Sequence, residues 1–216
     1  MKVIAVNGSP RKSWNTATLL NKALEGAAAQ GAGTELLHLY DFTYKGCTSC
    51  FACKMKDGKQ QGRCAMKDDL TPILKKIEDE ADAIVLGSPI YFGSMSGEMR
   101  SFLERLLFAP TIYTKPPKSL FPRKIRTGVI YTMNLTEELS MERGYGKIFS
   151  MVEEPLRSIF GEAESLCCYD TYQFPDYSKV VMEYMDPAKK AAQRETGFPE
   201  DCRRAFELGG RLASGE

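Results

Sequence analysis

Five short runs of apolar, largely β-branched residues recur along the chain, and segments with helical spacing separate them. The runs predict β-strands over residues 2–6, 35–40, 83–87, 127–132 and 164–169. Between the first two runs, apolar residues recur at three- and four-residue steps from Leu20 to Ala28, which indicates an amphipathic helix. The same spacing returns from Met99 to Leu107. The pattern therefore alternates strand and helix.

Three further segments carry weaker helical patterns: residues 70–80, residues 144–160 with a bend near Pro155, and a C-terminal segment over 187–213 in two pieces around Pro199. Parallel strands need crossovers long enough to hold a helix, so strand–helix alternation predicts a parallel sheet with helices on both faces. We predict an α/β fold, a three-layer doubly wound sandwich around a five-stranded parallel sheet. Residues 1–216 are expected to form a single domain.

Two segments fall outside this alternation. Residues 41–69 are rich in cysteine, and residues 109–124 hold four of the eleven prolines. Neither is a domain, and both lie next to ends of predicted strands. We interpret them as a Cys-rich insertion and a Pro-rich loop, with residues 187–213 as a C-terminal helical extension.

Composition narrows the function classes. The chain has 216 residues, with 29 Lys and Arg against 28 Asp and Glu, so it has no basic surplus of the kind that binds nucleic acid. No stretch reaches the roughly 18 apolar residues of a membrane span, and Met1 leads directly into the first strand without a signal-peptide core. We expect a cytoplasmic protein with no membrane and no nucleic-acid partner. In that compartment most of the seven cysteines are expected to be thiols or ligands.

The loop after the first predicted strand is rich in groups that bind an anion. Ser9, Ser13, Asn15 and Thr16 offer short side-chain donors, and Arg11 adds a positive charge. The loop leads into a helix, whose first N–H groups attract negative charge. The loop has neither a Walker motif nor a Gly-x-Gly-x-x-Gly fingerprint, which favours a phosphate monoester. The alternative is a polar loop in which Ser13 or Asn15 merely caps the helix.

The loop after the third predicted strand, residues 87–97, combines Gly and Pro with the adjacent aromatic residues Tyr91 and Phe92. Such a loop can lay its main chain against a flat ring and offer N–H groups to ring nitrogens and carbonyls. The alternative is that the aromatic side chains pack under a neighbouring subunit.

Together these two loops closely resemble those of the NADPH-dependent FMN reductase and iron-sulfur flavoprotein family, which has a flavodoxin-like fold. The resemblance covers residues 1 to about 169. It implies strand order 2-1-3-4-5 and an FMN phosphate held by Ser9, Arg11, Ser13, Asn15 and Thr16. It also implies that the isoalloxazine edge lies on Pro89, Ile90, Tyr91, Phe92, Gly93 and Ser94, and that Thr132 and Asn134 reach the ring from the loop after the fourth strand.

Four cysteines, Cys47, Cys50, Cys53 and Cys64, fall within eighteen positions. Their Cys-x-x-Cys-x-x-Cys spacing suits a [4Fe-4S] cluster, and zinc accepts the same ligand set. Iron-sulfur members of the family have a similar motif with a shorter gap before the last cysteine, whereas other members keep the motif as a structural loop. A cluster, a zinc ion, and free thiols or an occasional disulfide are three open alternatives.

The remaining cysteines and the single histidine are interpreted as structural. Cys167 and Cys168 lie in the fifth predicted strand and Cys202 in the C-terminal helical segment, where small thiols pack in the core. His38 lies in the second predicted strand, and one histidine without a matching nucleophile or metal set makes no catalytic site. The sequence therefore argues against a hydrolase.

From the residues and the resemblance, we expect an oxidoreductase that binds FMN rather than FAD, takes hydride from NAD(P)H and reduces a quinone, a flavin or another small acceptor. No side chain is assigned a catalytic role, because the flavin carries the chemistry. One alternative is an iron-sulfur flavoprotein that relays electrons from a ferredoxin-like donor through a [4Fe-4S] cluster. A second is a non-enzymatic flavodoxin-like carrier. Apolar residues in the Pro-rich loop predict a homodimer or homotetramer.

Overall fold

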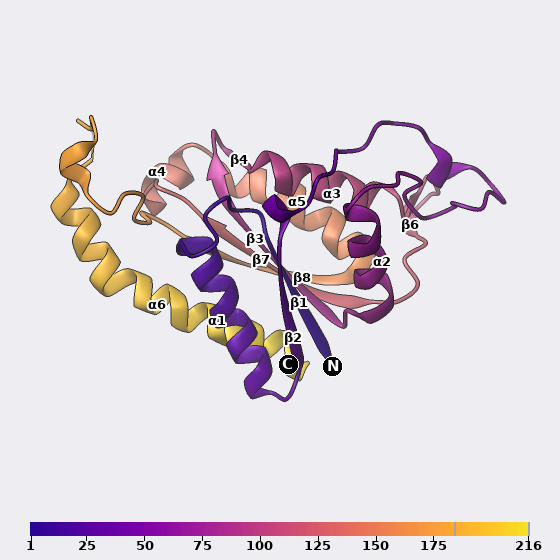
Figure 1. Ribbon diagram of the computed structural model, residues 1–216, viewed down its shortest axis with the longest axis horizontal. Helices are drawn as coiled ribbons and strands as arrows, with labels where there is room; N and C mark the ends of the chain where they lie inside the picture. The colour runs from indigo at the N-terminus through magenta and orange to yellow at the C-terminus, as the bar shows by residue number, and fades with distance from the viewer. Residues whose placement is uncertain (184, 216) are drawn as a thin grey trace.

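Five parallel strands form the central sheet in the order β2-β1-β3-β7-β8 (Figure 1). The computed structural model describes residues 1–183 and 185–215. Counted along the chain, this is the predicted order 2-1-3-4-5. The innermost strands are almost continuously apolar and buried, as strands covered on both faces are. The strands are β1 (Lys2–Asn7), β2 (Gly33–His38), β3 (Ala83–Tyr91), β7 (Ile125–Thr132) and β8 (Gly161–Cys168).

Two helical layers cover the sheet. On one face, α1 (Asn15–Ala29) and α6 (Pro187–Ser214) pack over one hydrophobic cluster; on the other, α2 (Leu70–Glu80), α3 (Gly97–Phe108) and α5 (Tyr145–Phe160) cover a second. The short helix α4 (Glu137–Glu142) precedes α5. Three 3-10 turns lie at Leu39–Asp41, Ala52–Lys54 and Tyr177–Lys179. The three-layer prediction is confirmed. No helix in the described ranges is long and apolar enough to cross a membrane.

All five strands differ from their predicted bounds: the first ends at Asn7, the fourth begins at Ile125, and the fifth spans Gly161–Cys168. The second ends at His38 because residues 39–41 turn into a 3-10 helix, whereas the sequence predicts a strand to residue 40. The third continues to Tyr91 and pairs with the short antiparallel strand β4 (Ser94–Met95). Phe92 and Gly93 both have positive φ, at 49° and 77°, as the central residues of a tight hairpin require. The predicted loop is therefore largely a hairpin with Phe92 at its tip.

The C-terminal helix is one continuous helix, so the prediction of two pieces around Pro199 is wrong. A proline inside a helix costs about 3 kcal/mol. The stripe of buried residues on α6 includes Phe198 just before the proline and Leu208 and Leu212 after it, and its burial against α1 and the sheet offsets that cost.

Helices α1 and α6 approach so closely that only glycine fits where they cross. A Cβ atom on Gly209 would lie 1.7 Å from the carbonyl oxygen of Ala23, and one on Gly26 would lie 1.9 Å from that of Phe206. Gly210, the next residue on α6, is not constrained in this way, since a Cβ atom there would lie 3.9 Å from the carbonyl oxygen of Gly26. The crossing fixes where α6 runs and therefore which of its residues reach the end of the sheet.

The Cys-rich insertion and the Pro-rich loop contact each other beside the sheet. The Pro-rich loop contains a small hairpin of β5 (Thr111–Ile112) and β6 (Lys118–Ser119). The ammonium group of Lys54 in the insertion donates to the carbonyl oxygens of Phe108, Ala109 and Thr111. The Phe121 ring meets the Phe160 ring of α5 edge to face. Part of the Pro-rich loop thus packs on its own chain.

The three cysteines outside the insertion lie in or against the core. Cys168 is fully buried, and Cys167 and Cys202 are half-buried against the two hydrophobic clusters. Burial raises the pKa of all three thiols above the ordinary value. They are neutral packing groups at physiological pH.

Candidate functional site

The loop between β1 and α1 presents an open helix N-terminus. Trp14 is the N-cap residue of α1, and no side chain of the described residues caps the helix. The alternative in which Ser13 or Asn15 caps it is therefore wrong. The first N–H groups of a helix have no partner within the helix, and here they face the end of the sheet uncapped. An anion with several oxygens is the natural partner for such groups.

A short chain of hydrogen bonds fixes the shape of this loop. The Oδ1 atom of Asn7 accepts from the backbone N–H of Ser9 at 2.9 Å, and the Oγ atom of Ser9 accepts from the N–H of Arg11 at 3.2 Å. The Nδ2 atom of Asn7 lies 2.9 Å from Nδ1 of His38. Gly8 has no room for a side chain, because a Cβ atom there would lie 2.8 Å from Cβ of Met99. His38 is thus a structural histidine that supports the anion-binding loop through Asn7.

The bond between His38 and Asn7 requires a neutral imidazole. The Asn7 amide nitrogen is a donor, so Nδ1 of His38 must accept, and a protonated ring has no acceptor. Burial lowers the pKa of His38, with a smaller opposing effect of Asp41 and a lowering effect of Lys12. Because the pKa is lower in the folded protein than in the unfolded chain, the bond between Asn7 and neutral His38 contributes fully at pH values above the unfolded-state pKa. The bond is lost as the pH falls through the folded-state pKa and the ring is protonated.

We therefore expect FMN affinity to fall more in the parent protein than in His38→Gln as the pH is lowered from 7.5 through the folded-state pKa of His38, by about 3- to 10-fold once the ring is protonated. One hydrogen bond is worth this factor, and the glutamine carbonyl accepts from Asn7 at every pH. The phosphate of FMN also titrates near pH 6, but equally in both proteins. Fluorescence titration of FMN measures both affinities. Parallel pH profiles would show that His38 does not support the loop.

Three loops that are far apart in the sequence converge at the carboxyl ends of β1, β3 and β7. They line a narrow cavity of about 70 Å³. Ligands of open parallel sheets bind at this end of the strands. The hydroxyl groups of Thr16 and Thr132 join two of the loops at 2.8 Å. The predicted site residues on this cavity are Ser9, Arg11, Asn15, Thr16, Pro89, Ile90, Tyr91, Thr132 and Asn134.

Four predicted site residues do not line this cavity. Ser13 is exposed and is not among the residues that line this cavity. Phe92 is fully exposed at the hairpin tip and borders a neighbouring cavity. Gly93 lies beside it in the turn, and Ser94 lines a third cavity between α3 and α5.

The segment after β8 closes the cavity, although no sequence motif marks it as part of the site. The carbonyl oxygen of Tyr172 accepts from Nε1 of Trp14 at 2.9 Å and from Nδ2 of Asn15 at 2.7 Å. The carbonyl oxygen of Gln173 accepts from Arg11, and Arg194 on α6 donates to Oδ1 of Asn15 at 3.1 Å. The amide of Asn15 is thus occupied by protein groups. Only the position of this segment at the carboxyl end of the fifth strand could have indicated its role.

A wider cavity of about 570 Å³ adjoins the narrow one, and the two share Ile90, Met133 and Asn134. The Oδ1 atom of Asn134 is buried and has no hydrogen-bond partner among the described residues. Buried Lys190 pairs with Asp170 and donates to the backbone carbonyl of Asn134 at 2.9 Å, which holds this loop in place. A flat ring with N–H groups would satisfy the Asn134 oxygen. The open helix start and this unpaired acceptor together fit a flavin mononucleotide.

The four cysteines of the insertion line one small cavity of about 20 Å³. Buried Arg105 lines it too; its guanidinium bonds Asp68 and the Lys45 carbonyl through Nη1, while Nε and Nη2 have no partner in the part of the chain that the structure describes. Burial raises the pKa of the Cys53 thiol. The donor set suits a cluster, yet among the described residues no three His, Cys, Asp or Glu side chains lie close enough together to hold a metal ion.

The fold and the open anion site define a mononucleotide-binding α/β protein. The family model for NADPH-dependent FMN reductase matches residues 1–132. The chain therefore belongs to the NADPH-dependent FMN reductase family.

Curated relatives and solved structures agree with this assignment. The chain is 42% identical over 105 residues to an iron-sulfur flavoprotein of Methanocaldococcus jannaschii, a match that covers 49% of this chain and 51% of the relative. An iron-sulfur flavoprotein of Archaeoglobus fulgidus is 41% identical over 105 residues, covering 49% and 48%. The match thus spans about half the length of these relatives.

Among solved structures, the fold is similar to an NAD(P)H:quinone oxidoreductase from Methanothermobacter marburgensis, with a TM-score of 0.73, 14% identity and 98% of both chains covered. It is also similar to an FMN-dependent NADH-azoreductase from Bacillus anthracis in complex with FMN, with a TM-score of 0.62, 14% identity and 99% and 100% coverage. At such identities the likeness shows the fold, which is flavodoxin-like.

Proposed function

We propose that the protein is an FMN-dependent oxidoreductase that takes hydride from NAD(P)H and passes electrons to a quinone, a flavin or another small acceptor. The observation that carries this proposal is the convergence of three loops around an uncapped helix start. Bound FMN would supply hydride and electron transfer. The relative named as a quinone oxidoreductase and the azoreductase with bound FMN support the same class of reaction.

The residues of this chain bind and orient the cofactor. The first-turn N–H groups of α1, the Ser9 hydroxyl and the Arg11 charge would hold the phosphate. The Pro89–Tyr91 backbone would support the ring edge, and the Oδ1 atom of Asn134, which has no partner among the described residues, would accept a hydrogen bond from the ring. The wider cavity beside Asn134 and Phe92 leaves room for the nicotinamide donor and the acceptor to use the same place in turn.

Cofactor release and a turnover assay test the proposal. We expect stoichiometric FMN, and no FAD, when the cofactor is released and chromatographed. We also expect NAD(P)H oxidation that depends on an added quinone or flavin, with parallel double-reciprocal lines for alternating substrates. Bound FMN without NAD(P)H oxidation would favour the non-enzymatic carrier, and absence of FMN would refute both.

A second candidate function is electron relay through a [4Fe-4S] cluster held by Cys47, Cys50, Cys53 and Cys64. Two observations favour it: the four thiols line one cavity, and Arg105, which lines it too, has two donors without a partner among the described residues, which a negatively charged cluster would satisfy. Curated relatives that are named iron-sulfur flavoproteins add support. A ferredoxin-like protein would then be the electron donor.

Iron and sulfide analysis of anaerobically purified protein separates this candidate from the first. A cluster gives about four iron atoms per chain and broad absorption beneath the flavin bands. A chain with full FMN and no iron would leave four thiols or a zinc site, and zinc analysis then decides between those. Cys50→Ser should remove the iron, whereas Cys202→Ser on α6 serves as a matched control.

We also propose that the protein assembles as a homodimer or homotetramer. The hairpin tip exposes Tyr91 and Phe92, and the Pro-rich loop exposes Tyr113 and Leu120. Apolar side chains gathered on two loops are typical of covered surfaces. Light scattering at micromolar concentration tests this, since the monomer mass is 24.1 kDa.

A further inference from the structure

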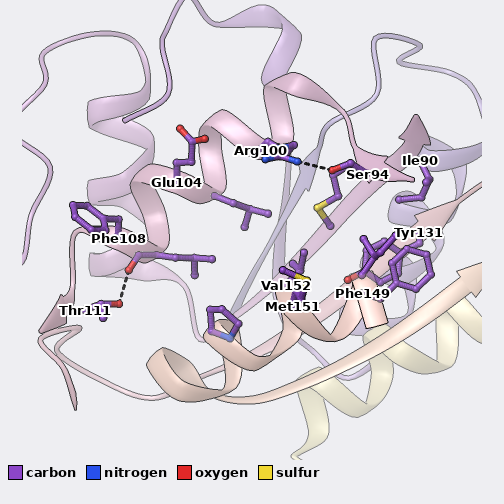
Figure 2. Close-up of a pocket in the computed structure, with 15 residues that line it drawn as sticks. Ile90, Ser94, Arg100, Glu104, Phe108, Thr111, Tyr131, Phe149, Met151 and Val152 are labelled. Carbon is purple, nitrogen blue, oxygen red and sulfur yellow. Dashed lines mark hydrogen bonds between the residues drawn. The ribbon is translucent and has the colours of Figure 1, made fainter. Parts of the chain in front are cut away.

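A cavity of about 540 Å³ lies between α3 and α5, beside the β3–β4 hairpin, and the proposed function does not use it (Figure 2). Cavities of about 300–1,000 Å³ hold small organic molecules. Its walls are mainly apolar side chains from the two helices, namely Leu103, Leu107, Phe149 and Val152. Ile90 lines both this cavity and the narrow cavity of the FMN site, so the two are neighbours.

Each polar side chain at this cavity makes at least one hydrogen bond to a described protein group, with one exception. Arg100 donates to Oγ of Ser94 at 2.9 Å, and Thr111 donates to the carbonyl oxygen of Leu107 at 2.8 Å. Glu104 accepts from the N–H of Cys47 at 3.0 Å. The exception is the Tyr131 hydroxyl, which has no hydrogen-bond partner among the described residues.

The Tyr131 side chain is fully buried on β7, and its ring stacks on that of Phe149 at 4.1 Å between centroids. In Figure 2 its oxygen points to the side of the pocket on which Val152 and Met151 lie. Burial, and then the charge of Glu153, raise its pKa far above the ordinary value, so the hydroxyl keeps its proton. A buried hydroxyl without a partner is unfavourable, and a group that accepts its proton would remove that cost.

We infer that this cavity binds a neutral, apolar ring compound that carries a carbonyl oxygen, with the oxygen accepting a hydrogen bond from Tyr131. The apolar walls favour a ring, and the stacked Tyr131–Phe149 pair offers it an aromatic surface. The two charged side chains at the cavity, Arg100 and Glu104, carry opposite charges, so the cavity has no net charge that would attract an ionic ligand. Met151 borders the cavity and is largely exposed, so its flexible side chain can move to admit the ring.

The test uses FMN-loaded protein without NAD(P)H and two small probes, 1-indanone and indane, which differ by the carbonyl group. Isothermal titration calorimetry measures the affinity of each. We expect Tyr131→Phe to weaken 1-indanone binding about 3- to 10-fold, the worth of one hydrogen bond, and to leave indane binding unchanged. The matched control Tyr145→Phe, a tyrosine outside this cavity, should change neither affinity.

Two further measurements locate the site and control for folding. Val152→Trp fills the cavity and should abolish binding of both probes while FMN content is kept. Without a probe, Tyr131→Phe should melt no lower than the parent protein, because it removes only an unpaired hydroxyl. The inference is overturned if 1-indanone does not bind, if Tyr131→Phe leaves its affinity unchanged, or if Val152→Trp still binds it. Light scattering that shows a dimer, together with no probe binding, would assign the cavity to a second copy and equally overturn it.

Discussion

Ser9→Asp is expected to weaken FMN binding by at least 100-fold. Ser9 is buried in the narrow cavity beside the open start of α1. A carboxylate there would compete for the same N–H groups and repel the phosphate, and like charges in contact at a binding site cost several kcal/mol. About 2.7 kcal/mol corresponds to the 100-fold loss. Quenching of FMN fluorescence on titration measures the affinity.

The same charge placed at Ser13 is the matched control. Ser13 is exposed and does not line the cavity, so Ser13→Asp should change FMN affinity no more than about threefold. Riboflavin, which lacks the phosphate, should lose much less affinity than FMN in Ser9→Asp. Equal losses for the two Asp variants, or for the two ligands, would place the phosphate elsewhere.

Gly209→Ala is expected to lower the free energy of unfolding by about 3 kcal/mol. The new methyl group would fall 1.7 Å from the Ala23 carbonyl oxygen, which belongs to the backbone and cannot rotate away. The helices must separate, and overpacking of this kind typically costs about 1–3 kcal/mol, with more where the backbone itself must move. FMN affinity should fall as well, because Arg194 on α6 supports Asn15 in the first loop. Urea unfolding followed by circular dichroism gives the stability.

Gly210→Ala makes the same chemical change one residue away. The new Cβ atom would lie 3.9 Å from the carbonyl oxygen of Gly26, which is an ordinary van der Waals contact. The substitution should therefore be neutral or stabilise α6 by up to about 1 kcal/mol, because alanine has a better helix propensity than glycine. If both variants lost the same stability, helix geometry rather than the crossing with α1 would be responsible.

The layers of the fold, and the place of the first loop at the carboxyl end of the sheet, could be predicted because both depend on strong local signals. Buried parallel strands are nearly uninterrupted apolar runs, and a loop dense in Ser, Asn, Thr and Arg before a helix is typical of a phosphate site. The limit appears at Ser13. Spacing alone does not reveal that the helix begins at Asn15, and that start leaves Ser13 outside the cavity.

The features that could not be predicted depend on the backbone rather than on particular side chains. Tyr172 and Gln173 hold the first loop through carbonyl oxygens, which every residue type possesses, so their sequence carries no signal. The hairpin tip places a phenylalanine at positive φ, where glycine or asparagine would have indicated a turn. Pro199 predicted a helix break, but tertiary packing of α6 determined the outcome.

The ammonium group of Lys54 is coordinated by backbone carbonyl oxygens, as a bound alkali-metal cation would be. Its ammonium group is surrounded by the backbone carbonyl oxygens of Phe108, Ala109 and Thr111, and the Phe108 ring centroid lies 4.0 Å away. Its partners lie at the C-terminal end of α3, where the helix dipole favours a cation. The hydrogen bonds of Lys54 therefore join the Cys-rich insertion to the Pro-rich loop. Neutralising this single amine, for example by acetylation, would weaken the link between the two segments, while the Phe121–Phe160 contact still holds the Pro-rich loop on α5.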